Sequence, residues 1–144
     1  MTLAAPAPVW VKPAIFDSIA GVVAGFSTRL GGVSVSPFDS LNLGLSTNDT
    51  REAVLENRRR LFGAVGFEAG QLAITGQVHG AEVAVVETPG LYPGFDGLVT
   101  TTPRLLLCLS AADCASVLFA RADGGMVGAC HAGWRGAAGG IVAR

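Results

Sequence analysis

One amphipathic helix and a series of short apolar segments predict a mixed α/β (α+β) fold for this chain of 144 residues. Hydrophobic residues make up 50 % and charged residues 15 % of the sequence, so we expect a collapsed apolar core rather than disorder. The 20 glycines are about twice the usual share of roughly 7 %, which indicates many tight turns and close backbone contacts. The length favours one domain, residues 1–144.

Charge, hydropathy and cysteine use argue against several classes of protein. The formal net charge of −1 offers no basic surface to a nucleic acid, and no apolar run has the length that a membrane span requires. The proline-rich N-terminal segment lacks the positive region of a signal peptide. Three cysteines without a C-x-x-C pair do not form a disulfide framework. We therefore expect a protein of the reducing cytoplasm that binds neither nucleic acid nor membrane.

The clearest helix is predicted between Asp49 and Gly66. Asp49 can cap its first turn, with Glu52 three residues later as in a capping box, and Gly66 suits the residue that ends a helix. Apolar residues recur at spacings near 3.6 and form one face: Ala53, Val54, Leu61, Ala64 and Val65. The run Arg58–Arg60 is interpreted as a solvated helix face near the C-terminus. The alternative is that one of these arginines binds an anionic ligand.

Short strands are expected on both sides of this helix. Before it, we predict a proline-rich extended arm over 1–13, one or two strands over 15–26, and a long loop over 27–44 whose length favours a function. The strands expected after it are Leu72–Gln77, Val83–Glu87, Gly97–Thr100 and Leu105–Leu109, the last of them covered on both faces. Two further strands, forming a hairpin around R-A-D-G-G, are Val117–Ala120 and Met126–Cys130. Residues 139–144 predict the first turns of a second helix.

Three residues at the predicted ends of strands carry the most chemistry: His79, Cys114 and His131. Side chains from different strand ends can meet there, and two imidazoles with one thiolate suit Zn²⁺ with a fourth position open. The residues leave open a metal-free alternative, in which Cys114 is a nucleophile and a histidine is its base. Asp113 would then orient the base, or act as the carboxylate partner of a metal-bound histidine.

Residues on glycine-rich turns are candidates for substrate binding. Trp134 in H-A-G-W-R-G can stack on a planar ring, and the adjacent Arg135 can bind a phosphate or carboxylate group. Arg29 in S-T-R-L-G-G offers a second cation on a loop whose amides can help to hold an anion. Together these residues are candidates to bind a planar ring and an anionic group such as phosphate or carboxylate.

Several segments, in the same order and with similar gaps, resemble the multi-copper polyphenol oxidoreductase laccase family. They are G-F-S-T-R-L-G-G-V-S (25–34), S-L-N-L-G (40–44), E-N-R-R-R-L (56–61), Q-V-H-G (77–80), D-G-L-V-T (96–100), A-D-C (112–114) and H-A-G-W-R-G (131–136). The resemblance covers nearly the whole chain from about residue 25 onward. As a set, these motifs are specific to the family.

The resemblance implies a layered α/β/β/α sandwich with mixed sheets. It also implies that His79, Cys114 and His131 are the family's metal site, described with zinc and in older accounts with copper. Members of the family are regarded as purine nucleoside phosphorylases, which convert adenosine, inosine or guanosine and phosphate to the free base and ribose 1-phosphate. Adenosine deamination and methylthioadenosine cleavage are implied as side activities.

Three other readings of the sequence remain. Family members continue beyond H-A-G-W-R-G, whereas this sequence stops at Arg144, so we expect the C-terminal part of the family fold to be missing. Such a chain could be an inactive binding or regulatory module, with exposed apolar surface that favours self-association. The metal-free Cys–His hydrolase or amidase is the second reading. Copper-dependent phenol oxidation, the third, is disfavoured because one His₂Cys set cannot form several copper centres.

Overall fold

The computed structural model describes residues 9–144, so the first eight residues of the predicted arm lie outside the described part. The chain divides into two compact units. One contains Val23–Ala69 with the segment that ends at Ala14, and the other contains Ile15–Val22 and Gly70–Arg144. One domain over residues 1–144 therefore stays a prediction.

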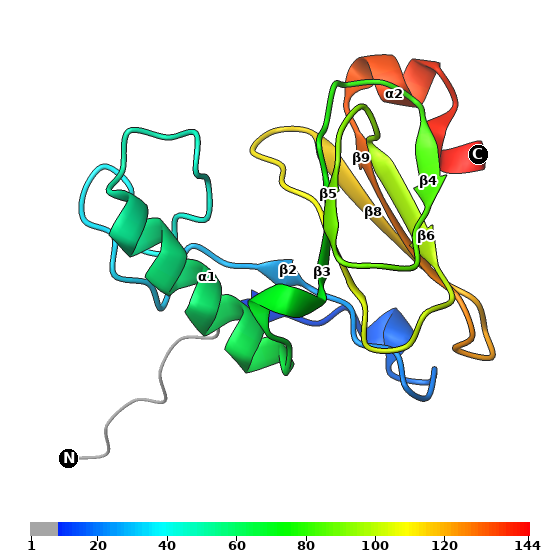
Figure 1. The fold of residues 1–144 in the computed structure, drawn as a ribbon, viewed down its shortest axis with the longest axis horizontal. Coiled ribbons are helices and arrows are strands. Elements are labelled where there is room, and N and C mark those ends of the chain that lie inside the picture. Colours follow the sequence, from blue (N-terminus) through cyan, green and yellow to red (C-terminus); the bar gives the residue numbers. More distant parts are fainter. Residues whose placement is uncertain (1–8) are drawn as a thin grey trace. The chain divides into compact units, whose positions relative to one another are not determined.

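The helix of the first unit, α1, spans Arg51–Val65 (Figure 1). Its N-cap is Thr50, whose hydroxyl accepts a hydrogen bond from the Ala53 amide at 3.3 Å. The prediction of Asp49 as the cap was wrong, because hydrogen bonds from Ser34, Asn42 and the Thr50 amide occupy its carboxylate. The first two of these hydrogen bonds are the main reason why the pKa of Asp49 is lowered. Gly66 ends the helix with φ 83°, as predicted.

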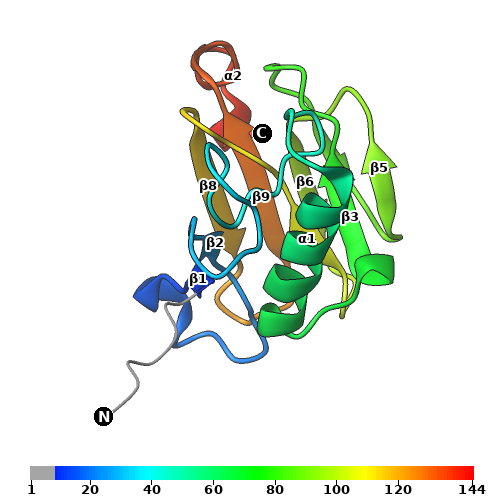
Figure 2. The ribbon, with the colours of Figure 1, turned by 90° about the vertical axis from the view of Figure 1, so that its left-hand side faces the viewer.

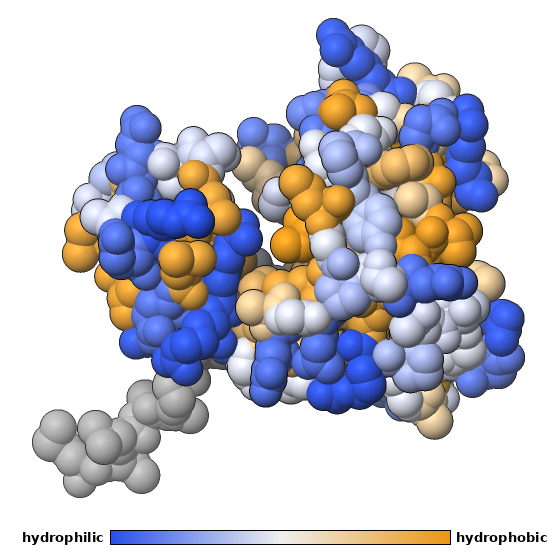
Figure 3. Space-filling view, viewed as in Figure 1, coloured by the Kyte–Doolittle hydropathy of each residue, from blue (hydrophilic) through white to orange (hydrophobic). Residues whose placement is uncertain are grey.

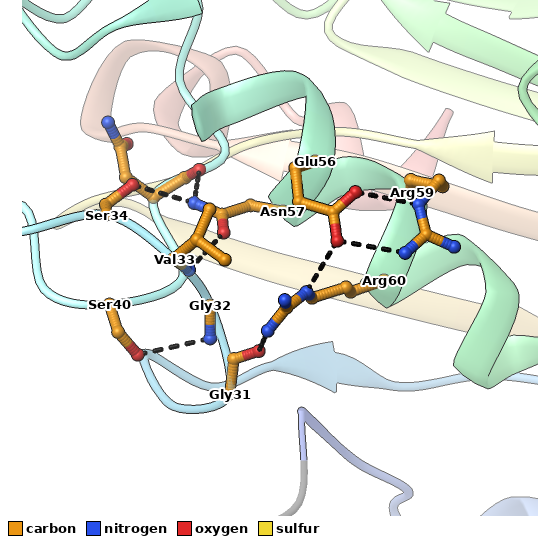
Figure 4. Close-up of polar contacts among 10 residues, drawn as sticks. Gly31, Gly32, Val33, Ser34, Ser40, Glu56, Asn57, Arg59 and Arg60 are labelled. Carbon is orange, nitrogen blue, oxygen red and sulfur yellow. Dashed lines mark hydrogen bonds and ion pairs between the residues drawn. The ribbon is translucent and has the colours of Figure 1, made fainter. Parts of the chain in front are cut away.

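A buried asparagine joins α1 to the long loop that precedes it (Figure 4). Asn57 is fully buried; its Oδ1 accepts from the Val33 amide at 2.8 Å. Its Nδ2 donates to the Ser34 hydroxyl at 2.8 Å and to the Asn42 carbonyl at 2.9 Å. The apolar face that the sequence predicts is thus interrupted by a polar group that organises the loop.

We expect Asn57→Ala to lower the free energy of unfolding by about 2–3 kcal/mol, because it leaves buried polar groups of the loop without partners. Urea denaturation of this chain measures the loss. Asn48→Ala is the matched control, since Asn48 is exposed, and it should change stability little. Equal stabilities for the two variants would contradict the proposed role of Asn57.

Two arginines of the run lie on the exposed side of α1, whereas Arg58 is half-buried. Arg59 and Arg60 pair with Glu56 at 2.7 and 2.8 Å, and their side chains are 73 % and 40 % exposed, which confirms the solvated helix face. Hydrogen bonds from these two arginines lower the pKa of Glu56 to about 2. Arg58 donates to the Leu43 carbonyl, and Arg60 also reaches the Gly31 carbonyl. These contacts hold the loop against the helix within the first unit.

Two short strands, β1 (Trp10–Val11) and β2 (Phe26–Ser27), pair antiparallel in the first unit. The prediction of strands over 15–26 was otherwise wrong. A 3-10 helix covers Ala14–Phe16, and turns follow, because Gly21 adopts a left-handed backbone conformation with φ 77°.

The second unit contains two sheets (Figures 1 and 2). The order of the larger sheet is β4-β6-β9-β8, with β4 parallel and β9 antiparallel to β6. Its strands are β4 (Val83–Val85), β6 (Gly97–Thr100), β8 (Ala115–Ala120) and β9 (Val127–Ala132).

The smaller, parallel sheet has the order β5-β3-β7. Its strands are β3 (Leu72–Thr75), β5 (Gly90–Tyr92) and β7 (Leu106–Cys108). A mixed sheet and a parallel sheet, together with helices, confirm the predicted α/β class.

Both sheets contribute to one apolar core. Ala73 of β3 and Leu98 of β6 are buried in it together with Val86 and Leu105. Apolar side chains also remain on the surface of this unit, among polar ones (Figure 3). Val85 and Leu91 are 79 % and 66 % exposed. Self-association through such surfaces stays a prediction.

The strand predictions of this unit are largely confirmed, with boundaries shifted by a few residues. The hairpin is β8–β9, paired from Ala115↔Ala132 to Ala120↔Val127. β5 was missed, because G-L-Y is too short for a visible alternation. The prediction that Leu105–Leu109 is covered on both faces holds only in part. Leu105 is buried in the core, but the residues of β7 are half-buried.

The C-terminal helix begins earlier than predicted. α2 spans Trp134–Ala138, and a 3-10 helix covers Ile141–Ala143. The break between them falls at Gly140, which has φ 81°, so residues 139–144 do not form the start of one helix. Over residues 9–144, no helix combines the length and the apolar character that crossing a membrane would need.

Candidate metal centre

The second unit brings His79, Cys114 and His131 together. One ligand atom from each, an imidazole nitrogen or the Cys114 sulfur, lies within 4.8 Å of the other two. His79 lies in the turn between β3 and β4, Cys114 directly precedes β8, and His131 lies near the end of β9. The pairing of Ser116 with His131 in the β8–β9 hairpin places Cys114 beside His131. Three separate elements therefore supply one cluster.

This donor set fits a zinc or copper ion. In a tetrahedral site with metal–ligand bonds of about 2.0–2.3 Å, ligand atoms lie about 3.3–3.8 Å apart, so a small inward movement of the side chains suffices. Gly133 packs against the cluster with no side chain between them. A Cβ at this position would lie 3.2 Å from His79 Cδ2 and 3.4 Å from the Cys114 sulfur. Imidazole and thiolate are ligands that zinc and copper share. Three protein ligands leave a coordination position for a substrate or solvent.

A buried carboxylate, Asp96, organises both histidines. Asp96 is fully buried and lies directly before β6. Its Oδ2 accepts from His131 Nδ1 at 2.8 Å and from the His79 amide at 3.1 Å. Its Oδ1 accepts from the amides of Val78 and Gly80 at 2.8 and 3.0 Å. Because Nδ1 of His131 faces the carboxylate, Nε2 is left to bind a metal.

The hydrogen bonds also decide the charge of Asp96. Burial by itself raises the pKa of this carboxyl, but the bonds from His131 and from the amides of Val78, Gly80 and His79 outweigh it. The pKa of Asp96 is therefore lowered, and the carboxylate stays ionised. An ionised acceptor keeps the proton of His131 on Nδ1.

The turn that carries His79 has an uncommon backbone. Gln77 and His79 adopt φ 27° and 60°, in the left-handed region that residues other than glycine rarely enter. Such a conformation costs about 1–3 kcal/mol per residue. It directs three consecutive amides at Asp96, which offsets part of this cost.

An open cavity of about 250 Å³ adjoins this cluster and is lined by His79, Trp134 and Arg135. Trp134 is 77 % exposed, and the Arg135 guanidinium lies over its ring, 5.2 Å from the centroid. The glycine-rich turn thus places an aromatic ring and a cation beside a candidate ligand, His79.

Two other candidate residues have surroundings that differ from those predicted. Asp113 is exposed next to Cys114, whereas the carboxylate bonded to His131 is that of Asp96. Arg29 belongs to the first unit, where it pairs with Asp39 at 3.0 Å. Sequence reasoning assigned no role to Asp96. The available signal was its position as the acidic residue that opens the D-G-L-V-T segment, directly before a strand.

Comparison with known proteins identifies the family of this chain. The family model described as multi-copper polyphenol oxidoreductase laccase matches residues 23–144. A protein of Deinococcus radiodurans named purine nucleoside phosphorylase is 47 % identical over 119 residues, which is 83 % of this chain and 46 % of that protein. Escherichia coli purine nucleoside phosphorylase YfiH is 40 % identical over 136 residues, 94 % of this chain and 53 % of that protein. The chain spans about half the length of these curated relatives.

Solved structures show the same fold. The crystal structure of YlmD from Geobacillus stearothermophilus matches with a TM-score of 0.83 and 39 % identity, over 98 % of this chain and 54 % of that chain. A Bacillus licheniformis protein, YfiH, described as hypothetical, matches with a TM-score of 0.82 and 32 % identity, over 95 % of this chain and 54 % of that chain. The chain belongs to the multi-copper polyphenol oxidoreductase laccase family.

Proposed function

We propose that this chain carries the metal centre and part of the substrate site of a purine nucleoside phosphorylase. One observation carries the proposal: an aromatic ring and a guanidinium line a cavity together with His79 of the His–Cys–His cluster. Relatives named purine nucleoside phosphorylase support the substrate class, a purine nucleoside with phosphate. Zinc is the ion we expect, and copper is the alternative with the same ligands.

The side chains of the cavity suit the two substrates. The exposed face of Trp134 can stack on a purine, and Arg135 can bind the phosphate. In phosphorolysis a phosphate oxygen bonds to C1′ of the ribose while the bond from C1′ to the purine nitrogen breaks, and the purine leaves with a proton. The main role of the Arg135 guanidinium is therefore to position the phosphate next to C1′.

The residues around the metal serve orientation and proton transfer. A zinc ion bound to these ligands would supply a Lewis acid. His79, Cys114 and His131 would hold it, with Asp96 fixing the proton of His131. Asp113, exposed beside Cys114, stays a candidate for proton transfer to the departing base.

The proposal extends to Arg29 and to side activities as expectations. Arg29 is a second candidate for the phosphate, and binding would require its guanidinium to leave the carboxylate of Asp39. Adenosine deamination and methylthioadenosine cleavage are expected side activities, because they use the same nucleoside site. The cytoplasm stays the compartment that we expect.

We expect one equivalent of zinc per chain, and its loss in His131→Ala and Cys114→Ser, because each change removes one of three ligands. Elemental analysis of the purified variants measures the metal. Cys108→Ser is the matched control, since Cys108 lies in β7, outside the cluster, and should keep the zinc.

The activity is tested with the same proteins. Release of free base from adenosine, inosine or guanosine should require both phosphate and metal, and should be lost in His131→Ala. Base release that is equal without phosphate, or unchanged in His131→Ala, would overturn the phosphorylase. Labelling of Cys114 by iodoacetamide together with activity that resists chelators would favour the metal-free Cys–His hydrolase instead.

A further inference from the structure

We infer that Gln77 is a positioning residue for the metal centre, because its side-chain amide ties the His79 turn to the segment that leads into Cys114. The inference rests on the metal site of the proposed function. Gln77 belongs neither to the cavity lining nor to the ligand cluster, so its effect is exerted through the position of the His79 turn relative to the segment before Cys114.

The amide of Gln77 makes a two-point contact with the backbone of Ser110. Gln77 Nε2 donates to the Ser110 carbonyl at 2.7 Å, and Oε1 accepts from the Ser110 amide at 2.8 Å. Oε1 also accepts from the hydroxyls of Ser110 and Thr75, at 3.2 and 3.0 Å. Since a backbone amide only donates and a carbonyl only accepts, these partners fix which end of the side chain is oxygen.

This contact continues a strand pairing that the main chain has already left. The last paired residues of β3 and β7 are Ile74 and Cys108. Beyond them the chain turns, with Gln77 at φ 27°, and the Gln77 side chain takes the place of a peptide opposite Ser110. This Gln77–Ser110 contact, here called the clamp, lies where the segments after β3 and β7 separate, one leading to His79 and the other to Cys114.

No direct strand pairing joins the segments that carry these two ligands. His79 lies between β3 of the smaller sheet and β4 of the larger one, whereas Cys114 precedes β8, at the edge of the larger sheet opposite β4. The segment after β7 crosses from one sheet to the other, and Ser110 lies near its beginning. The Gln77–Ser110 contact therefore joins the two ligand-bearing segments directly.

Asp96 alone does not hold the His79 turn. It binds the amides of residues 78–80 on one side and His131 on the other, but makes no hydrogen bond to the segment before Cys114. Left-handed residues persist only where their surroundings hold them. Without the amide of Gln77, Cys114 and His131 stay related through the β8–β9 pairing, while the His79 turn keeps only its bonds to Asp96 and loses its tie to the segment before Cys114.

Co²⁺ is the probe for this inference, because its thiolate charge-transfer and visible bands report whether the sulfur and imidazoles coordinate together. We expect Gln77→Ala to weaken Co²⁺ binding by about 10–100-fold, as for other residues that orient metal ligands, with an altered thiolate band. The Co²⁺ affinity of Gln77→Glu should lie between those of the wild type and Gln77→Ala, because this variant keeps the acceptor for the Ser110 amide and loses the donor to the Ser110 carbonyl. Gln71→Ala is the matched control, since Gln71 lies at the opposite end of β3, and should bind Co²⁺ like the wild type.

A readout without metal tests the clamp itself. Hydrogen exchange of the His79 and Ser110 amides should be faster in Gln77→Ala than in the wild type, while thermal unfolding shifts little because Ser110 is exposed. Wild-type Co²⁺ affinity and spectrum in both Gln77 variants would overturn the inference. A wild-type chain that takes up no Co²⁺ would overturn the metal site of the proposed function, and amide exchange would still decide whether Gln77 fixes the turn.

Discussion

Asp96→Asn is expected to abolish high-affinity metal binding while leaving the size of the side chain almost unchanged. If the amide oxygen keeps the bonds to the Val78 and Gly80 amides, the NH₂ group faces the His79 amide and Nδ1 of His131. The His79 amide then meets a second donor. The NH₂ group can donate to His131 only if Nδ1 carries no hydrogen, which moves the proton to Nε2 and removes that nitrogen as a ligand.

The reverse orientation of the new amide is worse, because its NH₂ group would face two backbone donors, the amides of Val78 and Gly80. We expect the free energy of unfolding to fall by about 2–3 kcal/mol and metal affinity to fall by about 100-fold or more. Urea denaturation and Co²⁺ titration measure the two effects. Asp123→Asn, at an exposed ion pair with Arg121, should change neither. An Asp96→Asn protein with wild-type metal affinity would contradict the assigned role of this carboxylate.

Gly136→Ala is the second change with a large expected effect. Gly136 is buried in α2, and a Cβ there would lie 2.5 Å from the carbonyl oxygen of Gly80. That oxygen belongs to the backbone of the His79 turn, so either the helix or the turn must move. Overpacking of this kind costs about 1–3 kcal/mol. Because the displaced turn carries a candidate ligand, metal binding should weaken together with stability.

Gly63→Ala provides the matched control for this steric argument. Gly63 lies inside α1, and a Cβ there would meet nothing within 4 Å. We expect Gly63→Ala to raise the free energy of unfolding by about 0.5–1 kcal/mol, because alanine favours a helix over glycine. Urea denaturation and Co²⁺ titration of both variants compare the two sites. If both variants bind Co²⁺ like the wild type, α2 does not constrain the His79 turn.

Short-range patterns made the elements predictable. Gly66 ends α1 at the expected residue because a left-handed position favours glycine. The β8–β9 hairpin follows from apolar segments on either side of an Asp-Gly turn. The cap of α1 was assigned to Asp49 rather than Thr50, since nothing in the local sequence reveals that Ser34 and Asn42 occupy the Asp49 carboxylate.

The ligands of the candidate site could be predicted from the sequence, but the residues that orient these ligands could not. Two histidines and a cysteine at strand ends, with the motifs that resemble the family, indicated His79, Cys114 and His131. The sequence favours Asp113 as their carboxylate partner, because it is adjacent to Cys114 in the chain. The hydrogen-bonded partner of His131 is Asp96, since the pairing of Gly97 with Cys130 places β6 next to β9.

The sequence by itself determined the mixed α/β class, the positions of most elements and the identity of three residues that suit a metal. These follow from hydrophobic spacing, turn residues and donor chemistry, which are properties of short segments. Only the tertiary structure decided how the ligands are held: by Asp96 across two strands, and by Gln77 opposite Ser110. The physical reason is that hydrogen-bond partners far apart in the chain are chosen by sheet pairing and burial, and neither is encoded in the residues next to them.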